Sequence, residues 1–290
     1  MSGQLNGWLV YKKDNAAKNE GFIRMLTEEA ALIGINLALV FEEDLILGIK
    51  QNQPYLSHPK LDVANIRFAI VRTINPLLSK QFEYCGIRCF NSSFVSHVCN
   101  DKALTQQYVT QLGIKSLDTY FLSNENFNPK NLPSSFPMVL KQVDGHGGNE
   151  VYLVHSSAEI RSIFLDFPNK RFILQEFSDN PGKDLRVFVI GTNIIGAVLR
   201  ESTTSFKANY TLGGQISPYH LTYTEITIVK KIISNLQADF IGIDFLLSKD
   251  NELIFNEIED VVGCRSLYST SEVNAARLYV EHINKAMKMG

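Results

Sequence analysis

The stretch FIGIDFLLSKDNELIFNEIED, Phe240–Asp260, has the pattern of two strands joined by a tight turn. Apolar runs stand on both sides of the polar segment SKDN, and this arrangement predicts a β-hairpin. Side chains alternate between the two faces of a strand. We therefore expect Phe255, Glu257 and Glu259 on one face of the second strand and Asn256 on the other.

Two glutamates on one strand face need an explanation, because like charges repel and are costly to remove from water. A cation between Glu257 and Glu259 would explain them, and so would a solvated edge strand. Asp244 lies on the first strand of the hairpin, at a comparable distance from the turn. The three carboxylates could converge on one face, and hard oxygen ligands of this kind suit Mg²⁺.

A second predicted hairpin has a glycine-rich tip, DGHGGNE, between the strands MVLKQV and VYLVHS. Gly145, Gly147 and Gly148 leave backbone N–H groups unshielded, so this loop can close over phosphate oxygens. Lys141, in an otherwise apolar strand, needs an anion if it is buried. A flexible hairpin tip that binds nothing is the alternative. The glycine-rich loop and the three carboxylates together would suit a nucleotide bound with Mg²⁺.

Composition narrows the class of protein. The chain has 290 residues, of which 45% are hydrophobic and 20% charged, and a formal net charge of −2. Scattered Lys and Arg disfavour nucleic acid as a partner. The absence of a long apolar run disfavours a membrane or secreted protein. The 4 cysteines form no CxxC pair, so we expect reduced thiols and a cytoplasmic location.

Strand-like and helix-like segments alternate along the chain, which predicts the α/β class. The first block, residues 1–97, resembles a small Rossmann-like unit, although it has no GxGxxG motif. Its expected helix is Asn19–Gly34, with Gly34 as the C-terminal cap. Its expected strands are Gly7–Lys12, Asn36–Asp44, Phe68–Thr73 and Gly86–Ser92.

The second block opens with a predicted helix, Asn100–Lys115, followed by a loop rich in Asn, Pro and Ser at Ser123–Pro137. Helical spacing of apolar residues predicts further helices over Glu225–Leu236 and from about Ser271 to the C-terminal end. Besides the two hairpins, the expected strands are Arg171–Phe177 and a pair within Asp184–Ser202, joined by the turn GTN.

With these segments in this order, the chain resembles an ATP-grasp ligase of the RimK type, from about Arg72 to Leu267 and most strongly from Asn100 onward. The resemblance implies an ATP-grasp fold preceded by the small Rossmann-like N-terminal domain. It places the ATP-grasp domain at 98–290, with a lid subdomain at about 112–178 and a metal-binding core at about 179–290.

The resemblance also implies roles for individual residues. NDKALTQQYVTQLGIK places Lys102 on nucleotide phosphate, and FPMVLKQVDGHGGNEVYLV places Lys141 there beneath a lid containing Gly147 and Gly148. FILQEF and GKDLRVFVIG are similar to the segments that meet the adenine and the ribose. The stretch LRESTTSFKANYTLGG is similar to the family's tract from a catalytic arginine to a nucleotide-contacting asparagine. The residues concerned are Glu176, Phe177, Lys183, Asp184, Arg200, Lys207 and Asn209, with Asp244 and Glu257 on the metal.

Two departures from the family pattern concern the same region. Glu259 stands where the family usually has asparagine, and DVVGC replaces a Ser-Pro-Gly turn. Glutamate remains a competent metal ligand. Just past the turn, Arg265 is a candidate partner for a substrate carboxylate, and Arg72 resembles a residue that faces the cleft from the first domain. Surface arginines at both positions are the alternative.

The activity implied is ATP-dependent joining of a carboxylate to an amine through an acyl phosphate, with Mg²⁺ or Mn²⁺. Arg200 and Arg186 are the candidates to stabilise developing negative charge. A small-molecule kinase and a nucleotide-binding protein without catalysis remain alternatives. Expected partners are an amino acid, a peptide or a carrier protein. Such ligases often form homodimers or homotetramers.

Overall fold

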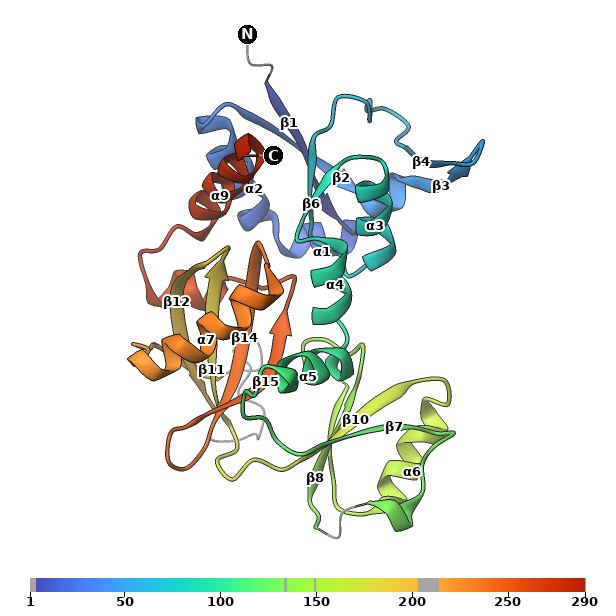
Figure 1. The fold of residues 1–290 in the computed structure, drawn as a ribbon, viewed down its shortest axis with the longest axis vertical. Coiled ribbons are helices and arrows are strands. Elements are labelled where there is room, and N and C mark those ends of the chain that lie inside the picture. Colours follow the sequence, from blue (N-terminus) through green and yellow to red (C-terminus); the bar gives the residue numbers. More distant parts are fainter. Residues whose placement is uncertain (1–3, 133–134, 149, 203–213, 290) are drawn as a thin grey trace.

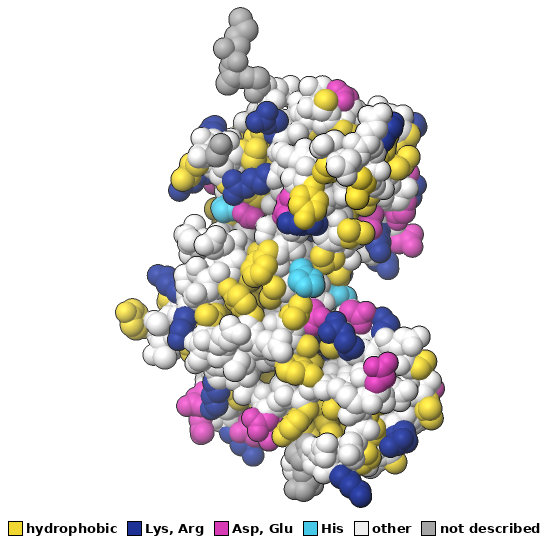
Figure 2. All heavy atoms as spheres, turned by 45° about the vertical axis from the view of Figure 1, so that its right-hand side comes forward, with side chains coloured by type: hydrophobic (Ala, Val, Ile, Leu, Met, Phe, Trp, Pro, Cys, Tyr) yellow, Lys and Arg dark blue, Asp and Glu magenta, His cyan; other side chains and the backbone are white. Residues whose placement is uncertain are grey.

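The computed structural model describes residues 4–132, 135–148, 150–202 and 214–289. The strands of these residues form three main sheets and one separate hairpin, and the three sheets follow one another along the chain (Figure 1). Within these residues no helix is both long and apolar enough to cross a membrane. On the face shown in Figure 2, Lys and Arg are interspersed with Asp and Glu.

The first sheet is parallel, with strand order β2-β1-β5-β6. Alternate residues of β1 serve two hydrophobic clusters: Leu9 packs with residues of α2, and Val10 with residues of α3. Helices therefore cover both faces of the sheet, as the predicted Rossmann-like unit requires. The bounds are β1 Leu5–Tyr11, α2 Glu20–Leu32, β2 Ile35–Phe41, β5 Phe68–Val71, α3 Pro76–Tyr84 and β6 Arg88–Phe90.

Several short elements of this block were not expected. They are α1 Lys13–Lys18, the 3₁₀ turn η1 Glu42–Asp44, the hairpin of β3 Ile46–Lys50 with β4 Gln53–Ser57, the helix α3, and α4 Ser93–Cys99. The hairpin turns at Gln51 and Asn52, both of which have positive φ. Without glycine in the turn, the usual sequence signal of a two-residue hairpin is missing.

The second sheet is antiparallel, with order β7-β10-β8-β9. The predicted hairpin of β8 with β9 is confirmed, and Gly147 and Gly148 in its tip have φ of 68° and 79°. Residues with a Cβ rarely adopt this backbone conformation. The bounds are α5 Lys102–Gln111, β7 Thr119–Ser123, η2 Pro129–Asn131, β8 Met138–Gln142, β9 Val151–Val154, α6 Ser157–Asp166 and β10 Arg171–Glu176.

The third sheet is antiparallel, with order β13-β12-β11-β14-β15. Both predicted strand pairs, β11 with β12 and β14 with β15, are confirmed. Helix α7 starts with a capping box between Thr222 and Glu225 and packs its apolar side on this sheet. The bounds are β11 Lys183–Ile190, β12 Asn193–Glu201, β13 Gln215–Pro218, α7 Tyr223–Leu236, β14 Phe240–Leu247 and β15 Leu253–Glu259.

A β-bulge in β15 changes which residues share a face. Asp244 pairs with Glu257, but the next residue, Phe245, pairs with Phe255, so Asn256 has no residue opposite it. Phe255 therefore packs in the hydrophobic core with Ile258 instead of sharing the face of the glutamates. The predicted face of Phe255 was wrong because the extra residue shifts the alternation by one position.

The C-terminal end of the chain returns to the first block. After α8 Arg265–Thr270, helix α9 Ala275–Met289 packs beside α2, where Tyr279 shares a hydrophobic cluster with Leu26 (Figure 1). Arg277 of α9 also forms an ion pair with Glu29 of α2, with 3.1 Å between Nε and Oε2. The predicted domain boundary at residue 97 stays a prediction, and the last helix in any case contacts both sides of it.

Candidate active site

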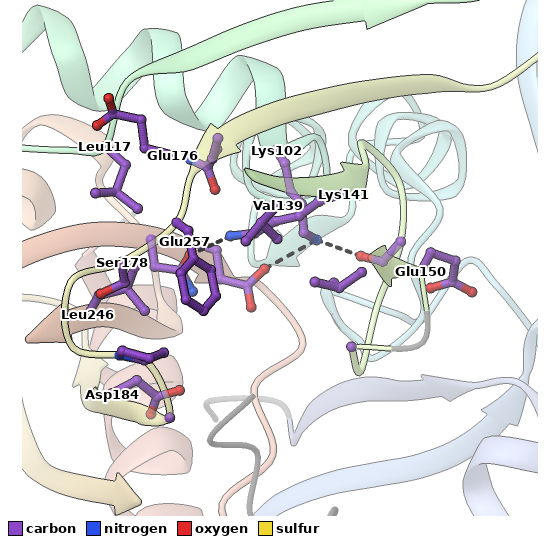
Figure 3. Close-up of a pocket in the computed structure, with 18 of the residues that line it drawn as sticks. Lys102, Leu117, Val139, Lys141, Glu150, Glu176, Ser178, Asp184, Leu246 and Glu257 are labelled. Carbon is purple, nitrogen blue, oxygen red and sulfur yellow. Dashed lines mark hydrogen bonds and ion pairs between the residues drawn. The ribbon is translucent and has the colours of Figure 1, made fainter. Parts of the chain in front are cut away.

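A pocket lies between the second and third sheets, beside the start of α5 (Figure 3). It is lined by all of the described residues that the sequence assigned to a nucleotide: Lys102, Lys141, Gly147, Gly148, Glu176, Phe177, Lys183 and Asp184. Lys207 and Asn209 lie outside the described residues. Leu117, Val139 and Leu246 add apolar lining that the sequence did not single out.

Two lysines point into this pocket from different elements. The Nζ atom of Lys102 donates to the carbonyl oxygen of Gly145 at 2.6 Å and lies 3.2 Å from Oε2 of Glu257. The Nζ atom of Lys141 donates to Oδ1 of Asn256 at 2.8 Å. Burial, reinforced by the nearby charge of Lys102, outweighs the opposing charge of Glu257 and lowers the pKa of Lys141 to about 8. An anion in the pocket would add negative charge and favour the protonated form of this lysine.

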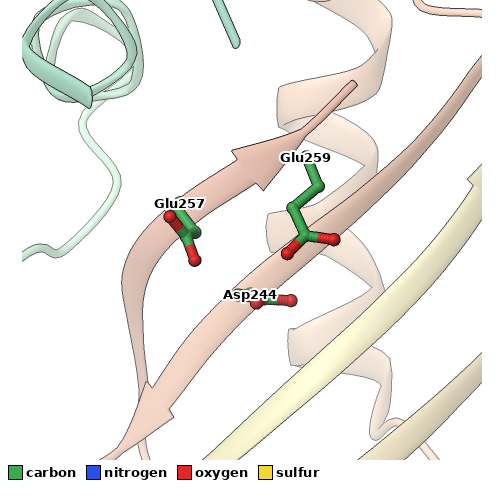
Figure 4. Close-up of side chains that lie close together, drawn as sticks. All are labelled: Asp244, Glu257 and Glu259. Carbon is green, nitrogen blue, oxygen red and sulfur yellow. The ribbon is translucent and has the colours of Figure 1, made fainter. Parts of the chain in front are cut away.

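The three predicted metal ligands lie close together on β14 and β15 (Figure 4). Asp244, Glu257 and Glu259 each offer a carboxylate oxygen, and these oxygens all lie within 4.8 Å of one another. Hard oxygen donors at such spacing fit Mg²⁺. The convergence follows from the register, since Asp244 pairs with Glu257 across the hairpin and Glu259 lies two residues further along.

Two buried arginines hold the same carboxylates. Arg186 donates to both oxygens of Asp244, at 2.7 and 2.6 Å, and to Oε1 of Glu259 at 2.5 Å. Arg200 donates to both oxygens of Asp184, at 2.5 and 2.9 Å, and to Oδ2 of Asp244 at 2.7 Å. The sequence placed these residues in the site without predicting that they form one network of ion pairs.

This network separates the acidities of its carboxylates. Burial alone would raise the pKa of Asp244, but Arg186 and Arg200 outweigh it and lower the pKa to about 2. For Asp184, burial raises the pKa to about 6 despite the charge of Arg200. Burial likewise raises the pKa of Glu259. Of Asp244, Asp184 and Glu259, Asp244 is therefore the most firmly ionised, and it is the one that both arginines contact.

A second cleft continues from the pocket toward α1, α2 and α8. Its lining includes Arg186, Arg200, Glu257 and Glu259, and also both residues predicted to meet a substrate, Arg72 and Arg265. Gly147, Gly148 and Glu257 line the pocket and the cleft alike. The two cavities therefore meet at the glycine loop and at one of the candidate metal ligands.

Arg72 and Arg265 differ in their surroundings. Arg72 is only 6% exposed, donates from Nη2 to the carbonyl oxygen of Val262 at 2.7 Å, and lies over the ring of Phe22. It has no ion pair with any described residue, and its Nε atom has no partner there. Arg72 is thus not the surface residue of the alternative interpretation. Arg265 is exposed, and it donates to the carbonyl oxygen of Lys18 at 3.3 Å.

Asn256 lines the pocket, although the alternation of side chains predicted it on the opposite face of the strand from Glu257. Strict alternation puts it opposite the glutamates, whereas the bulge leaves it lining the pocket with Glu257. A polar residue inside an apolar strand was the available signal. Strand periodicity cannot reveal a bulge, because the bulge depends on the pairing with β14.

Comparison with known proteins agrees with this geometry. The chain matches the model of the RimK-like ATP-grasp domain over residues 99–283. A probable alpha-L-glutamate ligase from Histophilus somni is 28% identical over 283 residues, which are 95% of this chain and 94% of the relative.

Solved structures with the same arrangement include a RimK domain ATP-grasp protein from Sphaerobacter thermophilus. It has a TM-score of 0.74 and 17% identity, over 96% of this chain and 99% of that one. The ATP-grasp ligase PsnB, solved with Mg, ADP and a phosphomimetic variant of its minimal precursor, has a TM-score of 0.71 and 12% identity, over 98% and 99%. At these identities the likeness shows a shared fold.

Proposed function

The chain belongs to the RimK-like ATP-grasp family, and from this premise we propose that it is an ATP-dependent ligase that joins a carboxylate to an amine. The observation that carries the proposal is the junction of the two cavities at Gly147, Gly148 and Glu257. A nucleotide whose phosphates lie near the lysines of the pocket would direct its terminal phosphate toward a substrate in the arginine-lined cleft.

For the nucleotide, we assign the phosphates to Lys102, Lys141 and the backbone of Gly147 and Gly148. The base would lie beside Glu176 and Phe177, against the apolar residues of the same pocket. The ribose would lie near Lys183 and Asp184, whose carboxylate Arg200 already orients. Lys207 and Asn209 are further candidate contacts by resemblance.

For the metal, Asp244, Glu257 and Glu259 are the proposed ligands of Mg²⁺, and the same oxygen donors would accept Mn²⁺. Bound there, the ion would neutralise phosphate charge and align the phosphates. Arg186 balances part of the charge of Asp244 and Glu259, so the extra carboxylate at position 259 need not repel a nucleotide.

The chemistry left to the chain is alignment and charge stabilisation. A substrate carboxylate attacks the γ-phosphate to give an acyl phosphate and ADP, and an amine then displaces phosphate through a tetrahedral intermediate. Arg200 and Arg186 line the cleft where negative charge develops, and both are held rigidly by carboxylates. The glycine loop, which borders both cavities, would exclude water that hydrolyses the acyl phosphate.

For the substrate, Arg72 is the most informative residue. A buried guanidinium without an ion pair among the described residues is costly unless an anion completes it. We assign Arg72 to a carboxylate of the substrate and Arg265 to the outer part of the same cleft. An amino acid, a peptide or a carrier protein could supply that carboxylate.

Lys141 makes ATP capture pH-dependent. Its pKa of about 8 means that the ammonium loses its proton as the pH rises above that value, and the attraction for phosphate is then lost. We expect kcat/KM for ATP to fall up to about tenfold per pH unit above pH 8. Lys141→Arg should remove this limb, because arginine stays protonated. An identical limb in this variant would contradict the assignment.

The ligase proposal is tested by supplying ATP and Mg²⁺ with panels of carboxylates and amines, and measuring ADP and products by mass spectrometry. A ligase releases ADP most rapidly when both substrates are present, and it yields a product whose mass is the sum of the two substrates less one water. Hydroxylamine should trap the acyl phosphate as a hydroxamate. Accumulation of a stable phosphorylated product would indicate a kinase instead. Nucleotide binding without ADP formation from any pair would contradict both enzymes.

A further inference from the structure

The β-bulge in β15 lies where this strand passes Lys141. Asn256 is the unpaired residue of the bulge, directly before Glu257. Its backbone carbonyl accepts a hydrogen bond from Nε2 of Gln106 in α5, at 3.0 Å. Bulges near active sites commonly redirect a side chain. Here the redirected side chain is an amide that lines the nucleotide pocket.

The amide is bonded to Lys141. Oδ1 of Asn256 accepts from Nζ of Lys141 at 2.8 Å, and within the described part of the chain this is the hydrogen bond that the ammonium makes (Figure 3). Lys141 has a four-carbon side chain whose rotational freedom must be lost before it can meet a phosphate. A fixed acceptor at the end of the side chain removes much of that freedom in advance.

We propose that Asn256 is a positioning residue, which holds the Lys141 ammonium at the phosphate end of the nucleotide pocket. This inference rests on the proposed function, since it assumes that the pocket binds ATP. The neutral amide suits the task better than a carboxylate does. It orients the ammonium without cancelling its charge, and it adds no repulsion toward phosphate oxygens.

The test compares the affinities of ATP and adenosine, measured by calorimetry with Mg²⁺ present. In Asn256→Leu we expect ATP to bind about tenfold more weakly, the typical effect of losing a hydrogen bond to a charged group. Adenosine has no phosphate, so its affinity should be unchanged. Asn256→Ala, which adds no bulk at the bulge, should show the same weaker binding of ATP and the same unchanged binding of adenosine. Asn235→Leu, on the exposed side of α7, is the matched control and should bind both ligands normally.

A double-mutant cycle tests whether Asn256 acts through the lysine. In a Lys141→Met background, Asn256→Leu should cause no further loss of ATP affinity. Additive losses would overturn the proposal, as would equal losses for ATP and adenosine, which would indicate a role in pocket shape alone. Unchanged ATP binding in both Asn256 variants would also overturn it. If the wild-type protein binds neither ligand, the proposed function itself fails.

Discussion

Replacing Glu257 with glutamine is expected to lower kcat on the order of a thousandfold, which is the scale of losing a preorganised group that stabilises the transition state. Glu257 lies where the pocket, the cleft and the carboxylate cluster meet, and it also faces Lys102 at 3.2 Å. The amide keeps the shape of the side chain but removes the negative charge that a metal ligand needs. ADP release measured over a range of Mg²⁺ concentrations would show the loss.

Glu252→Gln is the matched control for that experiment. Glu252 immediately precedes β15, is exposed, and pairs with Lys115 at the surface. Its replacement should leave turnover unchanged, because exposed ion pairs contribute little. Thermal unfolding should show that both variants remain folded. Undiminished turnover in Glu257→Gln would contradict the metal assignment.

Replacing Arg200 with methionine is expected to destabilise the protein by about 3–5 kcal/mol, since it leaves a buried carboxylate without its cation. Arg200 is the ion-pair partner of Asp184 among the described residues, and both side chains are less than a tenth exposed. The melting temperature should fall by roughly 10 °C. Turnover should fall as well, because Arg200 lines the cleft where negative charge develops.

The loss of stability in Arg200→Met should depend on pH in a definite direction. Burial raises the pKa of Asp184 to about 6 even with Arg200 present, so the folded state takes up a proton there before the unfolded chain does. Without Arg200 the pKa should rise further. The destabilisation should therefore be smaller at about pH 5, where Asp184 of the folded wild-type protein is protonated. It should be larger at about pH 8, where Asp184 of the wild-type protein is ionised in the folded and the unfolded state alike.

A second substitution separates stability from catalysis. In the double variant Arg200→Met/Asp184→Asn no uncompensated charge remains at this pair, so most of the lost free energy of unfolding should return. Turnover should not return, because the guanidinium is still absent. An Arg200→Met variant as stable as the wild type would contradict the buried network. Recovery of turnover in the double variant would contradict the catalytic role.

Local sequence patterns were sufficient for the hairpins β8–β9, β11–β12 and β14–β15 and for most of the longer helices. The turn SKDN between apolar runs predicted β14 and β15, and the glycine tip predicted β8 and β9. Pairing across a short turn is local, so the convergence of Asp244 and Glu257 could be predicted too. Shorter elements such as α4 and the glycine-free β3–β4 hairpin lack strong local signals.

The tertiary structure was needed for every feature that depends on which strands pair and which side chains come into contact. The bulge at Asn256 arises from pairing with β14, and it reversed the predicted place of Phe255. The burial of Arg72 depends on Phe22 and Val262, from distant parts of the chain. The sequence determined which charges exist and which local elements carry them. Only the packed sheets decided which of those charges neutralise one another and which are left for a ligand, because that depends on distances between segments far apart along the chain.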